Sequence, residues 1–309
     1  MQTYDIHIDG YGQELTRHGS AAFPLAVYTT TVSKNILGFI DWHWHDELQF
    51  CLVVKDSISV AVEGDSFVLH KGEGLFINSQ RLHSITNAPG ADATYICLDF
   101  HPRLIFGFDG SAVQTKYVEP FCQRDSLPYL RLEQTDLWGA EILDLLLRIY
   151  RSYSSSSPDE LQIMIWLASI WHAVVERCQN ADAGSAVNTI RPQMRAAMEY
   201  VGEHLAEPIS LSDIADHIGF AKSTCCREFK RQLGCTLTEY VLNARLQEAS
   251  RLLLTTDASV AEVATRCGFS SSSYFITKFR GKIGTSPAVY RKEHAGDHAD
   301  VLQTLQPTV

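Results

Sequence analysis

The sequence predicts a two-domain α+β protein, in which a small β-barrel or β-sandwich and two helices precede an all-α domain. Three observations support this fold class. The 309 residues are enough for about two domains. Short β-rich runs follow one another between Gln49 and Phe100. A helix-turn-helix pattern occurs twice in the last third of the chain.

The β-rich region alternates short runs of β-branched and aromatic residues with turn signals such as Gly64-Asp65. Short strands at even spacing are typical of a β-sandwich or a β-barrel. The region therefore predicts one of these two architectures. Its five runs are QFCLVV, SISVAV, SFVLH, GLFIN and ATYICLDF.

Two histidines and a glutamine precede or begin the first of these runs. Because residues 43, 45 and 49 have the same parity, we expect His43, His45 and Gln49 to share one strand face and to line the interior. Glu47 has the same parity and offers a carboxylate beside them. Trp44 has the opposite parity and is expected to pack on the other face.

Two helices are expected after the β-rich region, over residues 136–150 and 158–178. The first has an apolar stripe at helical spacing, whereas the second is apolar nearly all round and needs cover on two sides. One side can rest on the barrel. The other is covered either by a second subunit or by the partner helix of the same chain, and the sequence leaves both alternatives open.

A polar segment follows these helices. Residues 179–188 are small and polar with no periodicity, which is typical of a linker. We therefore place the β-rich domain and its helices in residues 1–178, a linker in 179–189 and the all-α domain in 190–294. The remaining residues, 295–309, are expected to form a flexible tail.

The repeated pattern begins with a capping box in each copy. Ser210 precedes Asp213 in the first copy, and Ser259 precedes Glu262 in the second. The serine can accept from the backbone amide three residues on, while the acid lies in the first turn of the helix. Each short amphipathic helix then ends at a glycine, as helices commonly do.

The second helix of each copy has one apolar face and one polar face. A helix, a short turn and a helix with a polar exposed face are typical of a DNA-binding helix-turn-helix. The serines Ser270–Ser273 therefore predict a helix start rather than a linker. Between the copies, apolar spacing predicts one helix of about 18 residues, which is about 27 Å long. Such a spacer suits two recognition helices set about one DNA turn, ~34 Å, apart.

The C-terminal stretch GCTLTEYVLNARLQEASRLLLTTDASVAEVATRCGFSSSSYFITKFRGKIGTSPAVYRK resembles the DNA-binding domain of the AraC/XylS family of transcription regulators, and the resemblance covers Pro192 to Lys292. It implies phosphate contacts by Lys230, Lys278 and Arg280. Only Arg227 among the implied base-reading residues can make a bidentate contact to guanine. The implied base-reading residues are Ser223, Cys226, Arg227, Ser272, Ser273 and Thr277.

The stretch HWHDELQFCLVVKDSISVAVEGDSFVLHKGEGLFINSQRLHSI resembles a cupin, the jelly-roll barrel that AraC/XylS regulators commonly carry as an effector-binding domain. The resemblance places His43, His45, Gln49 and His83 at the ligand positions of metal-dependent cupins, where Gln49 replaces the anionic glutamate. Three interpretations stay open. The four residues bind a metal, or they and Tyr95 hydrogen-bond a polar organic effector, or the histidines have no ligand role.

Charge and cysteine content fit this organisation. The formal net charge is −10, yet residues 190–294 carry fourteen Lys and Arg against eleven Asp and Glu. That mildly basic third can face phosphates. The eight cysteines are scattered without a C-x-x-C pair, which favours free thiols in a reducing cytosol. We expect no signal peptide, and the longest apolar stretch, 161–175, is shorter than the ~20 residues that span a bilayer.

The residues and the resemblance together imply a cytoplasmic, homodimeric transcription regulator. Its expected partners are double-stranded DNA and a small-molecule effector, with no membrane association, no enzymatic activity and no cofactor. The alternatives are a metal-dependent cupin enzyme fused to a DNA-binding domain, and a metal sensor that uses the same histidines. The sequence contains no Ser-His-Asp arrangement, phosphate loop or dinucleotide fingerprint that supports other chemistry.

Overall fold

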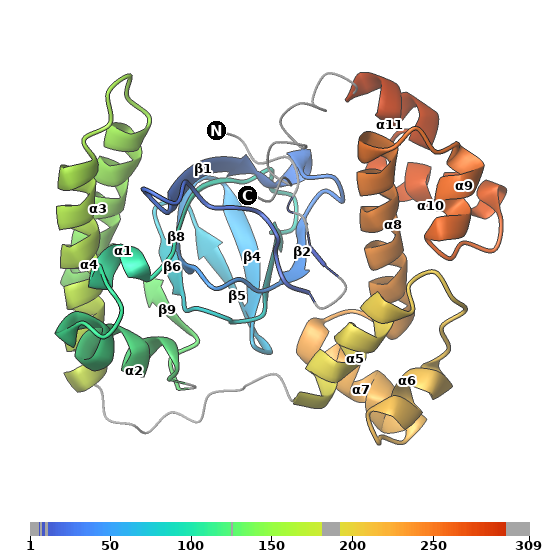
Figure 1. Cartoon of the computed structure of the whole chain (residues 1–309), viewed down its shortest axis with the longest axis horizontal. Helices are drawn as coiled ribbons and strands as arrows, with labels where there is room; N and C mark the ends of the chain where they lie inside the picture. The colour runs from blue at the N-terminus through green and yellow to red at the C-terminus, as the bar shows by residue number, and fades with distance from the viewer. Residues whose placement is uncertain (1–5, 7, 10–11, 125, 181–191, 295–309) are drawn as a thin grey trace. The chain divides into compact units, whose positions relative to one another are not determined.

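The computed structural model describes residues 6, 8–9, 12–124, 126–180 and 192–294 (Figure 1). The chain divides into two compact units. The first comprises Met1–Thr3, Arg17–Val32 and Trp44–Thr189, and the second comprises Tyr4–Thr16, Ser33–His43 and Ile190–Val309.

The β-rich part of the chain forms two antiparallel sheets, which confirms the prediction of a small sandwich or barrel of short strands. The five-stranded sheet has the order β1-β8-β3-β6-β9, and the four-stranded sheet has the order β2-β7-β4-β5. The strands are β1 (Leu25–Thr31), β2 (Ile40–His43), β3 (Leu48–Lys55), β4 (Ser57–Val62), β5 (Asp65–His70), β6 (Gly74–Ile77), β7 (His83–Asn87), β8 (Thr94–Phe100) and β9 (Tyr129–Leu132).

The expectation that residues 43, 45 and 49 share one strand is wrong. β2 ends at His43, and β3 begins at Leu48 in the other sheet. The backbone between β2 and β3 makes hydrogen bonds to a loop and not to a neighbouring strand. The His45 carbonyl accepts from Gln80 N at 2.7 Å. Likewise, the Asp46 carbonyl accepts from the Ser79 hydroxyl at 2.8 Å.

The five-stranded sheet is apolar on one face and polar on the other, because side chains alternate along each strand. On β3 and β8, Phe50, Leu98 and Phe100 belong to a buried core that the helices α3 and α4 complete. Each fully buried apolar side chain of this size stabilises the fold by about 1.5–3 kcal/mol. The helices are α3 (Leu137–Tyr153) and α4 (Glu160–Asn180), and the shorter elements nearby are η1 (Val32–Lys34), α1 (Arg103–Phe106), η2 (Gln114–Val118) and α2 (Glu119–Cys122).

The C-terminal part is helical, and its local signals agree with the sequence. Both predicted capping boxes are present, with reciprocal bonds between Ser210 and Asp213 and between Ser259 and Glu262. The predicted spacer is the 19-residue helix α8. The helices are α5 (Pro192–Glu203), α6 (Leu211–His217), α7 (Lys222–Leu233), α8 (Leu237–Thr255), α9 (Val260–Arg266), α10 (Ser272–Ile283) and α11 (Pro287–Glu293).

The second unit also includes a segment that precedes the β-rich runs. Leu37 is 5% exposed and belongs to one core cluster with Leu246, Phe275 and Phe279. The described part of the chain shows no helix long and apolar enough to cross a membrane, and all eight cysteines are free thiols. The predicted tail and most of the predicted linker lie outside the described residues, and the domain boundaries stay a prediction.

Candidate functional site

Helix α7 turns its apolar side inward and its polar side outward. Cys225 and Phe229 are fully buried. On the other side, Arg227 has 71% of its side chain exposed, and its Nε lies 4.0 Å from Glu228 Oε1. The predicted DNA-contacting residues on this exposed side are Ser223, Cys226, Arg227 and Lys230.

Helix α10 repeats this arrangement. Phe275 and Phe279 are fully buried. The Thr277 hydroxyl donates to the Ser273 carbonyl of its own helix at 2.9 Å, which leaves its oxygen as an acceptor. Ser271 caps the helix by accepting from Tyr274 N at 3.2 Å, so the serine run is a helix start as predicted. Of the predicted contact residues, Ser273, Thr277 and Arg280 are exposed, and Ser272 and Lys278 are half-buried.

Two of the candidate phosphate-binding lysines already have contacts. Lys230 Nζ donates to the Gly234 carbonyl at 2.9 Å, at the end of α7. Lys278 Nζ lies 5.4 Å from the centre of the Tyr274 ring, which is within range of a cation–π interaction. Tyr274 is 46% exposed and shares the outer face of α10 with the predicted residues. The sequence did not predict this exposed position, because an aromatic residue next to Phe275 is more often part of a hydrophobic core.

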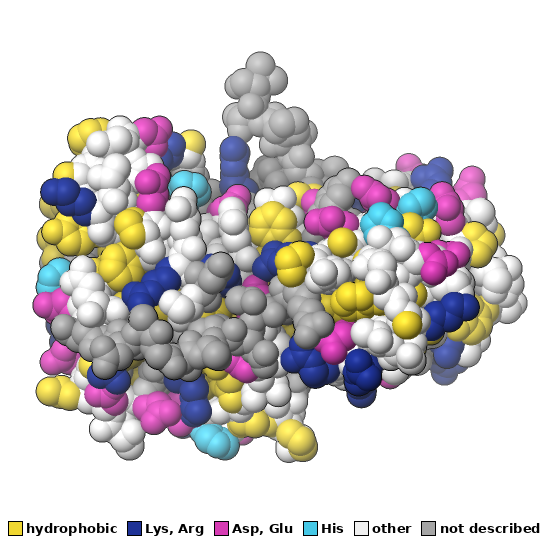
Figure 2. Space-filling view, turned by 90° about the horizontal axis from the view of Figure 1, so that it is seen from below, with side chains coloured by type: hydrophobic (Ala, Val, Ile, Leu, Met, Phe, Trp, Pro, Cys, Tyr) yellow, Lys and Arg dark blue, Asp and Glu magenta, His cyan; other side chains and the backbone are white. Residues whose placement is uncertain are grey.

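Figure 2 shows one face of the molecule, on which Lys and Arg side chains lie among Asp and Glu side chains. This mixture agrees with the modest positive balance of residues 190–294.

The three predicted histidines lie at or near strand ends. His43 ends β2, His83 begins β7, and His45 lies in the bend between β2 and β3. All three are buried, and the rings of His45 and His83, both in the first unit, have centroids 5.2 Å apart. Imidazoles are ligands that zinc, copper, iron and nickel accept.

Each imidazole is oriented by the backbone near it. His43 Nδ1 lies 2.8 Å from the Asp41 carbonyl, and His83 Nδ1 lies 2.8 Å from the Arg81 carbonyl. His45 Nδ1 lies 3.1 Å from the Glu47 carbonyl. Because a carbonyl only accepts, Nδ1 carries the proton, and Nε2 of each ring is the basic nitrogen. Metal-binding histidines are commonly held in this way.

The predicted Gln49 lies on β3 and contacts a cysteine rather than the histidines. Its Nε2 donates to Cys97 Sγ at 2.8 Å. Its Oε1 is buried and has no hydrogen-bond partner among the described residues. A buried amide oxygen of this kind can accept from a polar ligand, because burying it without a partner costs free energy.

The polar face of the five-stranded sheet continues on β8 with Tyr95, Cys97 and Asp99, which alternate with the core residues. Burial raises the pKa of the Tyr95 hydroxyl and the pKa of the Cys97 thiol well above their ordinary values, so both are neutral. Cys97 Sγ lies 3.4 Å from Asp99 Oδ2 and 3.7 Å from Cys51 Sγ. The face therefore offers neutral hydrogen-bonding groups together with a carboxylate.

Several of these residues were missed from the sequence. His18 is 7% exposed, and its Nδ1 lies 3.2 Å from the Tyr28 hydroxyl and 3.8 Å from Asp99 Oδ2. Strand parity along β3 and β8 would have found Cys51, Cys97 and Asp99. No local pattern marks His18, because it precedes β1 and reaches the polar face through tertiary packing.

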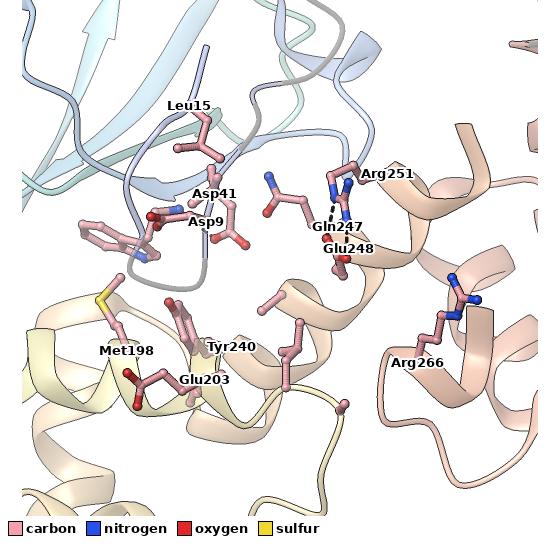
Figure 3. A pocket seen from close by; sticks show the side chains of 17 residues that line it. Asp9, Leu15, Asp41, Met198, Glu203, Tyr240, Gln247, Glu248, Arg251 and Arg266 are labelled. Carbon is pink, nitrogen blue, oxygen red and sulfur yellow. Dashed lines mark hydrogen bonds and ion pairs between the residues drawn. The ribbon is translucent and has the colours of Figure 1, made fainter. Parts of the chain in front are cut away.

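The second unit contains a pocket of about 480 Å³ that the sequence did not predict. Figure 3 shows Asp9, Asp41, Tyr240 and Glu203 around it, and the guanidinium of Arg251 is held by Glu248 through two bonds of 2.7 Å. Burial raises the pKa of the Asp41 carboxyl to about 6. The acidic lining disfavours phosphate, so this pocket is not part of the candidate DNA-contacting surface.

Two family models match the chain. A model described as an AraC-like ligand binding domain matches residues 27–169. A model described as a helix-turn-helix domain matches residues 214–293.

The chain is also similar to individual proteins. It is 35% identical over 286 residues to the HTH-type transcriptional regulator YdeC of Bacillus subtilis, covering 92% of this chain and 97% of that protein. It is 46% identical over 87 residues to the transcriptional activator NphR of Rhodococcus sp, covering 28% of this chain and 26% of that protein. A solved structure of the DNA-binding domain of AdpA in complex with a target DNA is 33% identical, covers 34% of this chain and 95% of that one, and has a TM-score of 0.33.

Proposed function

Since this chain belongs to the AraC family of HTH-type transcriptional regulators, we propose that it reads promoter DNA through α7 and α10 under the control of a small molecule held by the barrel. The observation that carries this proposal is the repeated helix-turn-helix, in which both second helices turn a polar face to solvent. We also infer that the protein acts in the cytoplasm, where it can meet the DNA that it reads.

Sequence reading is assigned to six side chains, of which Arg227 is the strongest. A guanidinium can bond O6 and N7 of guanine at once, and one such contact discriminates between bases by about 1–3 kcal/mol. The serines, the threonine and the cysteine offer single bonds or none. Lys230, Lys278 and Arg280 are assigned to phosphates, which position the protein without reading sequence. DNA shape therefore supplies a large part of the specificity.

The test is an Arg227→Ala variant titrated against DNA from the protein's own promoter and against unrelated DNA. We expect affinity for the promoter to fall about 5- to 150-fold, with little change on unrelated DNA. Arg131→Ala is the matched control, since Arg131 lies on β9 and pairs with Glu133 at 3.3 Å. An equal loss on both DNAs would assign Arg227 to phosphate instead, and no loss on either would remove α7 from the interface.

The effector is assigned to the polar side of the barrel, at His43, His45, Gln49, His83 and Tyr95. These residues are all buried. The Gln49 Oε1 atom is a hydrogen-bond acceptor with no donor among the described residues, and a polar ligand would supply that donor. A thermal-shift screen of small polar metabolites on the whole chain identifies candidates. Gln49→Ala should then abolish the shift caused by a true ligand while leaving DNA affinity unchanged in its absence.

Effector and DNA must influence each other equally if they are coupled. Thermodynamic linkage requires that the effector change the affinity for DNA by the factor by which DNA changes the affinity for the effector. Titrating promoter DNA with and without saturating effector measures this factor. Identical curves would mean that the ligand binds without regulating.

We infer that the chain acts as a homodimer through α4. Leu161, Met164 and Ile165 are 71%, 39% and 51% exposed on one side of this helix. Three large apolar side chains that remain exposed on a helix packed by its other side are typical of an interface. A second copy of the same helix presents a matching apolar surface, as an isologous contact requires.

A second candidate function is regulation by a metal ion at the positions that the cupin resemblance implies, which are His43, His45, Gln49 and His83. The buried rings of His45 and His83, with centroids 5.2 Å apart, favour it. Metal-dependent DNA affinity would support this function. We infer no catalytic role, since the relatives with assigned names are transcription regulators.

A further inference from the structure

The pocket in the second unit belongs to none of the functions assigned above. Its volume of about 480 Å³ is within the range of sites for small organic molecules. All of its lining residues belong to the second unit, and none is among the residues assigned to DNA or to the effector. They come from the segment before β1, from β2, from α5 and the turn after it, and from α8 and α9.

The charged part of the lining is acidic. Four carboxylates line the pocket against two guanidinium groups, and Glu248 and Arg251 neutralise each other through two bonds of 2.7 Å. The carboxylates of Asp9, Asp41 and Glu203 then outnumber the single remaining guanidinium group of the lining. Such a lining attracts a cation and disfavours an anion.

The Asp41 carboxylate is buried without a cationic partner. Asp41 is 8% exposed, and its Oδ1 accepts from Trp42 N at 2.8 Å. Its Oδ2 makes no hydrogen bond or ion pair to a residue that the structure describes. The Lys282 ammonium acts on Asp41 only from beyond ion-pair distance, and it lies 5.8 Å from the centre of the Phe39 ring. Burying a carboxylate oxygen in this way costs free energy, which a positively charged hydrogen-bond donor would offset.

A second buried polar group faces the same pocket from α8. Tyr240 is 8% exposed, and its ring packs edge-on against Phe229 with centroids 5.9 Å apart. Its hydroxyl makes no hydrogen bond within the described part of the chain, and Figure 3 shows it on the side of the ring that faces Asp9 and Asp41. Burial raises the pKa of this hydroxyl, and the negative charge of Asp41 raises it further. Tyr240 is therefore neutral, and its oxygen can accept a hydrogen bond from a ligand.

We propose that this pocket binds an organic ammonium ion, which is a primary amine carried by a small apolar or aromatic body. The ammonium donates to Asp41 Oδ2 and to the Tyr240 hydroxyl. The body lies against the buried side chains of Trp42, Met198 and Val201. A metal ion is a poorer occupant, since no three carboxylate, imidazole or thiol ligands gather at this pocket among the described residues. The site is additional to the effector site of the barrel.

The experiment titrates the full chain with hexylamine, benzylamine, phenethylamine and tryptamine by isothermal titration calorimetry. Each amine is compared with the alcohol and with the carboxylic acid of the same carbon skeleton. We expect at least one amine to bind one site per chain, about tenfold or more tightly than its alcohol, because a hydrogen bond between charged groups is stronger than one to a neutral group. The acids should not bind. If no amine binds more tightly than its alcohol, the proposal is overturned.

Two variants test the assigned contacts. Asp41→Asn removes the charge but keeps an oxygen that can accept from Trp42 N, and it should weaken amine binding about tenfold or more. Tyr240→Phe removes only the hydroxyl and should weaken binding about 2- to 10-fold. The matched control is Asp216→Asn, which removes an exposed carboxylate of α6 outside the pocket and should leave the affinity unchanged. Circular dichroism establishes that each variant is folded.

A further variant distinguishes this pocket from the barrel. Gln49→Ala alters the effector site and should bind the amine as the wild type does. If Gln49→Ala loses the amine while Asp41→Asn keeps it, the amine belongs to the barrel and the proposal is overturned. Equal losses in Asp41→Asn and Asp216→Asn would show a general attraction of the acidic chain for cations, which would overturn it too.

Discussion

Arg245 on α8 and Arg291 on α11 make the same pair of contacts in the two halves of the helical unit. Arg245 donates from Nε to the Leu205 carbonyl at 3.1 Å and from Nη2 to the Glu207 carbonyl at 2.6 Å. Arg291 donates from Nε to the Leu253 carbonyl at 2.9 Å and from Nη2 to the Ala258 carbonyl at 2.6 Å. In each half the guanidinium therefore holds the backbone that precedes a capping box, at Ser210 in the first half and at Ser259 in the second.

We expect Arg291→Ala to destabilise the helical unit by about 2 kcal/mol, because hydrogen bonds to a charged donor contribute about 1.5–3 kcal/mol. Arg291→Lys should restore little of this stability, since an ammonium group cannot make the two hydrogen bonds that the planar guanidinium makes. Urea denaturation followed by circular dichroism measures the change. Arg266→Ala, on the exposed end of α9, is the control and should cost less than about 0.5 kcal/mol. Equal losses of unfolding free energy in Arg291→Ala and Arg266→Ala would contradict the stabilising role assigned to the two hydrogen bonds of the Arg291 guanidinium.

The repeat itself was predictable because its signals are local. A capping box, a glycine after a helix and a 3.6-residue period all act within a few residues, and they appear in the structure where the sequence placed them. The contacts of Arg245 and Arg291 were not predicted. Each joins residues separated by two helices, and no short-range pattern marks them.

In the β-rich part, too, the sequence did not predict the contacts between residues that are far apart along the chain. Residues 43, 45 and 49 have the same parity, but parity does not distinguish a strand from a bend, so β2 and β3 were read as one strand. His83 and the other two histidines were found through the resemblance. His18 was not found, since it reaches the polar face of the five-stranded sheet by tertiary packing alone.

A prediction about salt dependence concerns Lys278. If Lys278 neutralises one phosphate, Lys278→Ala should reduce the slope of log K against log salt concentration by about 1. The same substitution should weaken binding to promoter and to unrelated DNA alike, because a phosphate contact carries no sequence information. Lys71→Ala, in the exposed turn between β5 and β6, is the control. An unchanged slope would place Lys278 outside the interface, with its ammonium only over the Tyr274 ring.

A prediction about pH concerns the capping boxes. Bonds from the backbone and hydroxyl of Thr236 lower the pKa of Glu239 from its ordinary 4.5, and bonds from Ser259 lower the pKa of Glu262 in the same way. A carboxyl with a lowered folded-state pKa stabilises the fold above its unfolded-state pKa, and this contribution is lost as pH falls through the folded-state value. The helical unit should therefore lose stability on acidification below pH 4.5.

Glu239→Gln tests this directly, because the amide keeps a hydrogen-bond acceptor but does not titrate. Melting temperatures measured between about pH 6 and pH 3 should fall less for this variant than for the wild type, since one source of proton uptake on unfolding is gone. Glu199→Gln, on an exposed side of α5 and outside the capping boxes of the described helices, is the control. A wild-type slope in the Glu239→Gln variant would show that its capping box contributes nothing to acid sensitivity.

The last prediction concerns α4 as the dimer interface. Leu161→Glu and Ile165→Glu together place two charges on the exposed apolar side of the helix, and two copies facing each other would bury them at a high cost in free energy. We expect sedimentation equilibrium to find a dimer for the wild type and a monomer for the double variant. Thermal stability of each chain should change little, because both side chains are exposed in the single chain.

Leu137→Glu supplies the matched control for that experiment, since Leu137 is 75% exposed but lies at the start of α3. It should leave the dimer intact. The monomeric variant should still bind one promoter half-site, because each chain carries both helix-turn-helix motifs, but it should protect a shorter stretch of DNA. A double variant that stays dimeric would assign the interface to another surface, and the exposed side of α4 would then require a different partner.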